Sequence, residues 1–335
     1  MRAFLVRVGL VAAAMTLSIA GATTAFGAGV AHASVPGTNS VYVHSPYPVL
    51  FSAASVGPTP IGGAAASPAG ANNWSCKPSA QHPDPVVLVH GLGATMAENW
   101  STMSPLLADN GYCVFALTYG LDPGENYVGG LEPMEVSSQQ LASFIDKVLA
   151  ATGAAKVDLV GHSEGTVMPQ YYLKRLGGAA KVNRYVALAP LYQGTTLYGL
   201  SAGITAFETY LPSMAAPIES LVASECGSCQ SFLNGSAFLT NLYRDGVYAV
   251  PGVTYTTIMT RYDELVVPYT SGELHAPNAT NIIVQDQCPL DFSEHLTLAW
   301  DPVAAQDILN ALDPGDAQPV PCTLVLPGLG APTFP

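Results

Sequence analysis

The sequence predicts an α/β fold in which a mostly parallel sheet is covered by helices on both faces. Continuous runs of β-branched and aliphatic residues, at 86–89 and 157–160, are typical of strands buried on both faces. Segments with helical periodicity alternate with such runs along the chain. Because strands joined by helices make right-handed crossovers, this alternation predicts that neighbouring strands run parallel.

The expected elements extend from residue 85 to residue 312. Strands are predicted near 86–89, 113–119, 157–160, 185–188, 253–260 and 280–285. Helices are predicted near 97–109, 134–151, 164–176 and 302–312. The alternation stops between residues 191 and 250, which we interpret as an insertion that caps one edge of the sheet.

Residues 1–33 have the layout of a secretory signal peptide. Arg2 and Arg7 supply a positive start, an apolar run follows at 8–20, and small residues precede Ser34. The run is shorter than the ~20 residues that a membrane-spanning helix needs. We therefore expect an exported, extracellular protein whose mature chain begins at Ser34.

The rest of the chain divides into three parts by composition. Residues 34–73 are rich in Ala, Gly, Ser and Pro without a sustained period, and we expect a loosely ordered arm or linker there. Residues 74–322 are expected to form one catalytic domain, which includes the 191–250 insertion. Residues 323–335 are expected to form a C-terminal tail.

The charge of the chain excludes nucleic acid as a partner. The full chain has 11 basic and 24 acidic residues. Removing Arg2 and Arg7 leaves 9 against 24, a net charge of about -15 for the mature protein. Such a surface repels phosphate backbones and disfavours anionic membranes.

Six cysteines in an exported chain predict three disulfides, for which fifteen pairings exist. The Cys-x-x-Cys at 226–229 has no second pair or nearby histidine to complete a metal site, and it sits in a Gly/Ser loop. We therefore expect a local disulfide there and no bound metal. The expected pairs are Cys76–Cys113, Cys226–Cys229 and Cys288–Cys322.

Ser163 is the candidate nucleophile. Residues 161–165 read Gly-His-Ser-Glu-Gly, directly after a buried-type strand and directly before a helix. Glycines on both sides of the serine permit a turn tight enough to push its Oγ clear of the sheet. A second Gly-x-Ser-x-Gly surrounds Ser201, but no strand precedes it.

A serine hydroxyl needs a base to take its proton. His295 follows the last expected strand, so its loop lies at the carboxyl edge of the sheet, whereas His275 precedes that strand. Asp263 follows the preceding strand and is expected to orient the imidazole, with the adjacent Glu264 as the alternative. Two further carboxylates near His295 are expected to be solvated, Asp286 and Asp291.

Stabilising a developing oxyanion requires preorganised N–H donors. We expect the backbone N–H of Glu164, at the start of a helix, and that of Leu92, in the loop after the first strand. His90 and His162 are expected to be structural.

Together these residues resemble the secreted bacterial lipases of the α/β-hydrolase fold, in particular the class 2 lipases of actinobacteria. The likeness covers roughly residues 73–322 and includes the segments 85–91, 111–115, 161–165 and 262–263, and His295 followed by 301–302. It implies a Ser-Asp-His triad, hydrolysis of triacylglycerol or shorter esters, no organic cofactor and a mobile cover over the site. Such lipases often carry Gln after the serine, where Glu164 stands here. This departure keeps the N–H donor, but an acidic side chain beside the oxyanion can slow the reaction or shift its pH range.

The leading hypothesis is a secreted carboxylic-ester hydrolase, a triacylglycerol lipase or esterase, that works as a monomer on lipid or other ester substrates at a lipid–water interface. One alternative keeps the triad and changes the substrate to cutin or another polyester, or the reaction to acyl transfer. A second alternative is a non-catalytic secreted binding protein.

Overall fold

The computed structural model describes residues 46–56, 63–121, 127–199, 226–331 and 334. Residues 47–334 form one compact unit. The expected signal peptide, the candidate Ser201 and much of the expected cover over the site lie outside the described residues.

A six-stranded parallel sheet forms the centre of this unit and confirms the predicted fold class. Its strands lie in the order β2-β1-β3-β4-β5-β6. Their bounds are β1 Val86–Val89, β2 Val114–Leu117, β3 Val157–His162, β4 Val182–Leu188, β5 Thr254–Met259 and β6 Ala279–Ile283. Because every paired strand is parallel, all six carboxyl ends lie at one edge, where the residues that follow each strand can meet.

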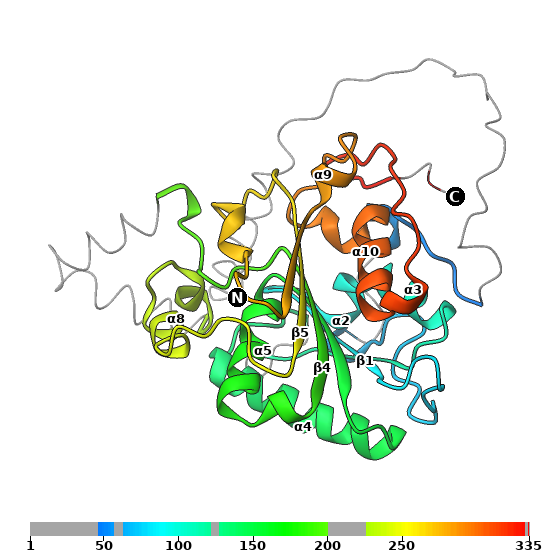
Figure 1. Cartoon of the computed structure of the whole chain (residues 1–335), viewed down its shortest axis with the longest axis horizontal. Coiled ribbons are helices and arrows are strands. Elements are labelled where there is room, and N and C mark those ends of the chain that lie inside the picture. Colours follow the sequence, from blue (N-terminus) through cyan, green and yellow to red (C-terminus); the bar gives the residue numbers. More distant parts are fainter. Residues whose placement is uncertain (1–45, 57–62, 122–126, 200–225, 332–333, 335) are drawn as a thin grey trace, which may run out of the picture. The chain divides into compact units, whose positions relative to one another are not determined.

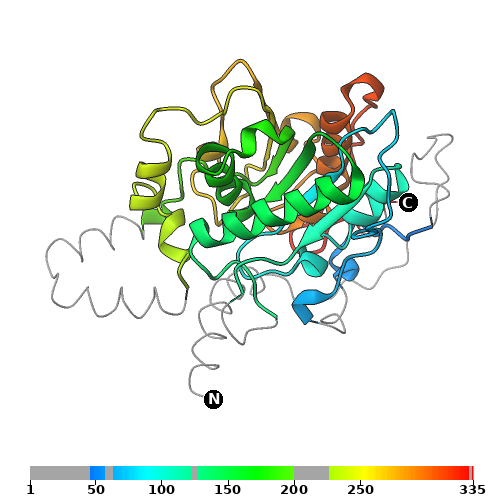
Figure 2. The same ribbon diagram turned by 90° about the horizontal axis from the view of Figure 1, so that it is seen from below.

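Helices cover both faces of the sheet. The helices α4 (Met134–Thr152) and α5 (Glu164–Arg175) pack against each other on one face, and α10 (Pro302–Leu312) lies on the other, against β4 and β5 (Figures 1 and 2). Short helices also occur, among them α8 (Ala237–Leu242) and α9 (Val284–Gln287). Among the described residues, no helix combines the length and the hydropathy needed to cross a membrane.

The single helix expected at 97–109 is wrong. The structure has two helices there, α2 (Met96–Asn99) and α3 (Met103–Asp109). Thr95 and Glu98 form a capping box that starts α2. Pro105 has no N–H to donate to the carbonyl four residues earlier, so one helix cannot run through both segments. The chain therefore turns at 100–102 and starts a new helix with the proline in its first turn.

The described parts of residues 34–73 and of the tail at 323–335 pack on the domain and on each other. Ser52 and Gly330 form an antiparallel bridge, and the Ala331 N–H donates to the Phe51 carbonyl at 2.6 Å. Phe51 is 3% exposed and its ring meets Phe334 edge-on. Composition alone does not reveal this pairing, because its partners lie almost 280 positions apart in the printed sequence.

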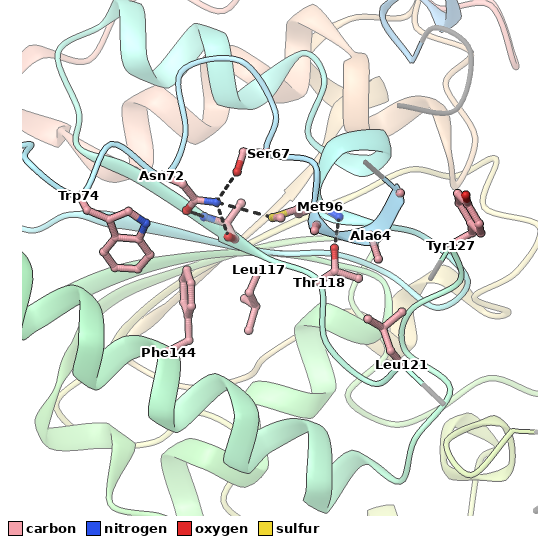
Figure 3. Close-up of a pocket in the computed structure, with 13 residues that line it drawn as sticks. Ala64, Ser67, Asn72, Trp74, Met96, Leu117, Thr118, Leu121, Tyr127 and Phe144 are labelled. Atoms are coloured by element: carbon pink, nitrogen blue, oxygen red, sulfur yellow. Dashed lines mark hydrogen bonds between the residues drawn. The ribbon is translucent and has the colours of Figure 1, made fainter. Parts of the chain in front are cut away.

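Asn72 occupies the open edge of β2. Its φ is 61°, and its backbone N–H donates to the Val114 carbonyl at 2.9 Å. Its side-chain amide donates to the Ala116 carbonyl at 2.9 Å and accepts from the Ala116 N–H at 3.0 Å. Figure 3 shows this amide beside a cavity of about 770 Å³, with Trp74 and Phe144 on its wall. Neither this cavity nor one of about 720 Å³ near Gly246 is lined by Ser163, Asp263 or His295.

The structure joins the three cysteine pairs named above. Cys76–Cys113 and Cys288–Cys322 close long loops, with sequence separations of 37 and 34, whereas Cys226–Cys229 has a separation of 3. In the chain-entropy description, a disulfide stabilises the folded protein more when it closes a longer loop of the unfolded chain.

We expect the double substitution Cys76→Ser/Cys113→Ser to lower the free energy of unfolding by about 4 kcal/mol, and Cys226→Ser/Cys229→Ser by about 2 kcal/mol. Denaturant unfolding of both variants beside the parent protein measures the two losses. A larger loss from the Cys226–Cys229 pair would contradict the loop-length explanation.

Candidate active site

Ser163 stands at a strained turn between β3 and α5. Its φ is 54° and its ψ is -119°, outside the helical and extended regions. A Cβ at Gly161 would lie 2.0 Å from the Gly165 carbonyl oxygen, and a Cβ at Gly165 would lie 2.1 Å from the Val89 carbonyl oxygen. Both contacts are impossible for a larger residue, so the two glycines are required for this turn.

The structure brings Ser163, His295 and Asp263 together. The His295 Nε2 lies 2.8 Å from the Ser163 Oγ, and its Nδ1 lies 2.9 Å and 3.0 Å from the two Asp263 carboxylate oxygens. His295 is 2% exposed and Asp263 is 7% exposed. The Asp263 Oδ1 also accepts from two backbone N–H groups, of Leu265 and Val266, which fixes the carboxylate. This arrangement can relay a proton from the hydroxyl to the imidazole.

Glu264, the alternative acid, does not contact the imidazole. Its Oε2 accepts from the backbone N–H of His295 at 3.3 Å. The carboxylate that meets the ring therefore belongs to Asp263, and Glu264 holds the backbone of the same loop. Burial, together with the nearby Glu294, raises the pKa of Glu264.

The other candidates lie elsewhere. The His275 side chain is 79% exposed and pairs with Glu273, and Asp286 pairs with Arg261 at 2.6 Å. The expectation that Asp291 is solvated is wrong, because this residue is fully buried. Its carboxylate accepts from the Ser293 N–H at 2.8 Å, inside the loop that carries His295. Within the described residues, no group of three or more His, Cys, Asp and Glu side chains is placed to hold a metal ion.

The expected oxyanion donors lie on either side of the serine. A Cβ on Gly91 would lie 3.1 Å from the Ser163 Cβ, so the loop that carries Leu92 passes directly beside the nucleophile. Glu164 is the first residue of α5, and an N–H at that position has no partner within its helix. In the part of the chain that the structure describes, neither the Leu92 nor the Glu164 N–H donates a hydrogen bond, so both are available to an oxyanion.

A second loop supports the Leu92 loop. The Gly93 N–H donates to the Gly129 carbonyl at 2.9 Å, and the Gly129 N–H donates to the Ala94 carbonyl at 3.1 Å. Ser228, inside the Cys226–Cys229 loop, donates from its hydroxyl to the Gly130 carbonyl at 2.6 Å. The Cys226–Cys229 loop thus anchors the segment on which the Leu92 loop rests.

Asn99 joins the site although the sequence analysis missed it. Its Oδ1 accepts from the Gly91 N–H at 3.0 Å and lies 3.0 Å from the His162 Nδ1. The His162 Nε2 lies 2.9 Å from the His295 carbonyl oxygen. Burial lowers the pKa of His162 to about 3, so its neutral ring supplies one N–H between these two acceptors. The one available signal was a histidine placed inside the elbow motif, which we interpreted as structural.

The carboxylate of Asp263 sets the protonation of His295. Burial alone lowers the pKa of the imidazole, but the charge of Asp263 and its hydrogen bond, with smaller contributions from the charges of Glu264 and Glu294, outweigh burial and raise the pKa above the ordinary 6.5. The ring is therefore neutral, and able to accept a proton, only on the alkaline side of that raised value.

We expect an NMR titration to find the His295 ring pKa above 6.5, and we expect Asp263→Asn to lower it, because the largest of the charges that oppose burial is then removed. The resonances of the exposed His275 provide an internal reference. A His295 titration that is unchanged by Asp263→Asn would contradict the assigned ion pair.

Comparison with known proteins places this geometry in a family. Residues 83–307 match the class 2 lipase family. A triacylglycerol lipase of Pseudarthrobacter phenanthrenivorans and one of Burkholderia plantarii are each 35% identical over 95 residues, which is 26% of this chain and 27% and 24% of those proteins. The crystal structure of Aspergillus fumigatus lipase B superposes with a TM-score of 0.50 at 19% identity, covering 79% of this chain and 61% of that one, and shows the same fold. The matched segment therefore spans about a quarter of the two relatives, but the family match covers well over half of this chain, and the chain belongs to the class 2 lipase family.

Proposed function

We propose that this protein is a carboxylic-ester hydrolase of the triacylglycerol lipase type, with Ser163 as its nucleophile. The observation that carries the proposal is the continuous contact from the Ser163 Oγ through the His295 ring to the Asp263 carboxylate. The membership of the class 2 lipase family supports the same reaction.

The reaction proceeds through an acyl-enzyme. The His295 Nε2 takes the proton of the Ser163 hydroxyl as Oγ attacks the ester carbonyl, and Asp263 stabilises the imidazolium that forms. The N–H groups of Leu92 and Glu164 receive the oxyanion. The imidazolium then gives its proton to the departing alcohol, and a water molecule, activated by the same ring, releases the acid.

Apolar side chains around the catalytic edge support a lipid substrate. Leu92 is 39% exposed beside the nucleophile, and Tyr262, next to Asp263, is 47% exposed and packs against Phe292. Phe292 is 36% exposed on the loop that carries His295. Exposed apolar groups on both sides of one edge suit an oily substrate at a lipid–water interface.

Export of the protein is part of the proposal. Three disulfides in the described residues suit an oxidising, extracytoplasmic compartment. The signal-like layout of residues 1–33 points the same way.

We expect Ser163→Ala and His295→Ala each to lower kcat by about 10³-fold or more, and Asp263→Ala to lose less, because the oxyanion donors and the base remain in that variant. Hydrolysis of a soluble p-nitrophenyl ester measures these losses, and an organophosphonate probe should label the parent protein but not Ser163→Ala. Full activity in Asp263→Ala with loss in Glu264→Ala would mean that Glu264 is the catalytic acid. Absence of labelling and of turnover would favour the non-catalytic binding protein.

The alternative substrates are separated by a panel. We expect the parent protein to hydrolyse emulsified triglyceride and p-nitrophenyl esters, with Ser163→Ala as the blank, because the apolar edge faces the nucleophile. Faster release of acid from a cutin or polyester film than from triglyceride would move the proposal to polyester hydrolysis. Ester exchange with an added alcohol that exceeds hydrolysis would favour acyl transfer.

A further inference from the structure

We propose that Glu164 is a positioning residue, and that its protonated carboxyl holds the oxyanion loop (residues 90–93) through Tyr119 and His90. The inference rests on the proposed function, because it concerns the loop that carries the Leu92 N–H. It assigns to the Glu164 side chain a task separate from that of its backbone N–H.

The Glu164 side chain is enclosed beneath the oxyanion loop. The residue is 0% exposed. A Cβ on Gly130 would lie 2.9 Å from the Glu164 Oε2 and 3.1 Å from the Leu92 Cα, so the carboxyl and the loop meet at the same glycine. Gly130 has a φ of 76°, which favours glycine independently of the contact. Among the described residues, neither carboxyl oxygen makes a close, well-aligned hydrogen bond in this conformation.

Tyr119 is the polar neighbour that interacts with this carboxyl. Its hydroxyl donates to the His90 carbonyl at 2.7 Å, and its ring stacks on the His90 ring with centroids 4.2 Å apart. A phenol has one hydrogen to donate, and here the His90 carbonyl receives it. The tyrosine oxygen therefore offers only a lone pair to Glu164. A protonated carboxyl can donate to that lone pair, whereas a carboxylate would compete for the hydrogen that His90 receives.

His90 passes this support to the peptide that carries the oxyanion donor. Its Nε2 accepts from the Tyr119 N–H at 3.2 Å, so its Nδ1 carries the proton and donates to the Gly91 carbonyl at 2.7 Å. Burial lowers the pKa of His90 to about 4, which keeps this neutral tautomer. The Gly91 carbonyl and the Leu92 N–H belong to one planar peptide and point in opposite directions. Holding the carbonyl therefore aims the Leu92 N–H.

The surroundings of Glu164 favour its neutral form. Burial raises the pKa of the carboxyl well above the ordinary 4.5, and the Tyr119 hydroxyl opposes this only in part. Among the described residues, the titratable group that interacts with it is Tyr119, from the segment after β2, on whose ring His90 stacks, whereas the segment 129–130 contributes only backbone. Both rings are neutral at physiological pH, so neither supplies a positive charge that would hold a carboxylate in place.

The raised pKa also has a consequence for stability. The folded protein binds the Glu164 proton more tightly than the unfolded chain does. The contribution of Glu164 to the free energy of unfolding is therefore complete below pH 4.5 and is lost as the pH rises through the pKa of the folded state. Replacing the carboxyl by an amide, which cannot ionise and has N–H groups to offer to the Tyr119 oxygen, removes that loss.

The test compares Glu164→Gln and Glu164→Leu with the parent full-length, disulfide-bonded protein. The matched control is Glu135→Gln, which removes another glutamate from the first turn of a helix, that of α4. Hydrolysis of p-nitrophenyl butyrate between pH 6 and pH 10, with Ser163→Ala subtracted as the blank, gives kcat and KM for each variant. Thermal unfolding over the same pH range gives Tm without any need for turnover.

We expect the parent and Glu135→Gln to share an alkaline decline in kcat, and we expect Glu164→Gln to raise the ratio of kcat at high pH to kcat at neutral pH. Its Tm advantage over the parent should grow with pH. Glu164→Leu should lower kcat about tenfold at every pH with little change in KM, less than the 10²–10³ that follows removal of an oxyanion donor. In a Tyr119→Phe background, Glu164→Gln should no longer change the alkaline limb of kcat.

An alkaline limb that is the same in the parent and in Glu164→Gln, or an undiminished kcat in Glu164→Leu, would overturn the inference. Failure of the proposed function has a different signature, namely no labelling of Ser163 and no ester turnover by the parent protein. In that case a Tm difference between Glu164→Gln and the parent that did not grow with pH would still overturn the assignment of a protonated Glu164.

Discussion

The contact between β3, α5 and the end of β1 is the constraint on which the site depends. Gly161 and Gly165 allow these segments to approach within distances that exclude any Cβ, and Ser163 is forced into a strained conformation between them. The same closeness places Ser163 beside Gly91, and Ser163 directly precedes the first residue of α5. The proposed nucleophile, the helix terminus and the Glu164 N–H therefore belong to a single turn, and the loop that carries Leu92 lies against that turn.

Much of the fold and the triad could be predicted because each rests on local patterns and on chain order. Strands such as Val86–Val89 are uniformly buried, and a parallel sheet brings the residues after β3 and β5 to one edge. Asp263 could be preferred over Glu264 only weakly, since which of two adjacent carboxylates turns inward is decided by the backbone N–H groups of Leu265 and Val266. No motif marks Asn99 itself, because its partners Gly91 and His162 become neighbours only after folding, and the histidine inside the elbow motif is the one indirect signal.

Polar groups behind the site set its electrostatics without contacting a substrate. Among the described residues three imidazoles are buried, and the pKa of His295 is raised while those of His90 and His162 are lowered, because the His295 ring contacts the Asp263 carboxylate directly. His162 and Asn99 link the loop of Gly91 to the loop of His295, so displacement of either loop is transmitted to the other. Ser228, in the Cys226–Cys229 disulfide loop, adds a further polar contact, because its hydroxyl donates to the Gly130 carbonyl.

The asparagine at the margin of β2 has a consequence for behaviour in concentrated solution. An uncovered outer strand presents unpaired amide groups to which another polypeptide can add, which is a common start of aggregation. Asn72 pairs with both backbone groups of Ala116 on the outer side of β2. This margin of the sheet thus carries a short amide plug in place of a further strand, which discourages copies of the protein from joining edge to edge through β2.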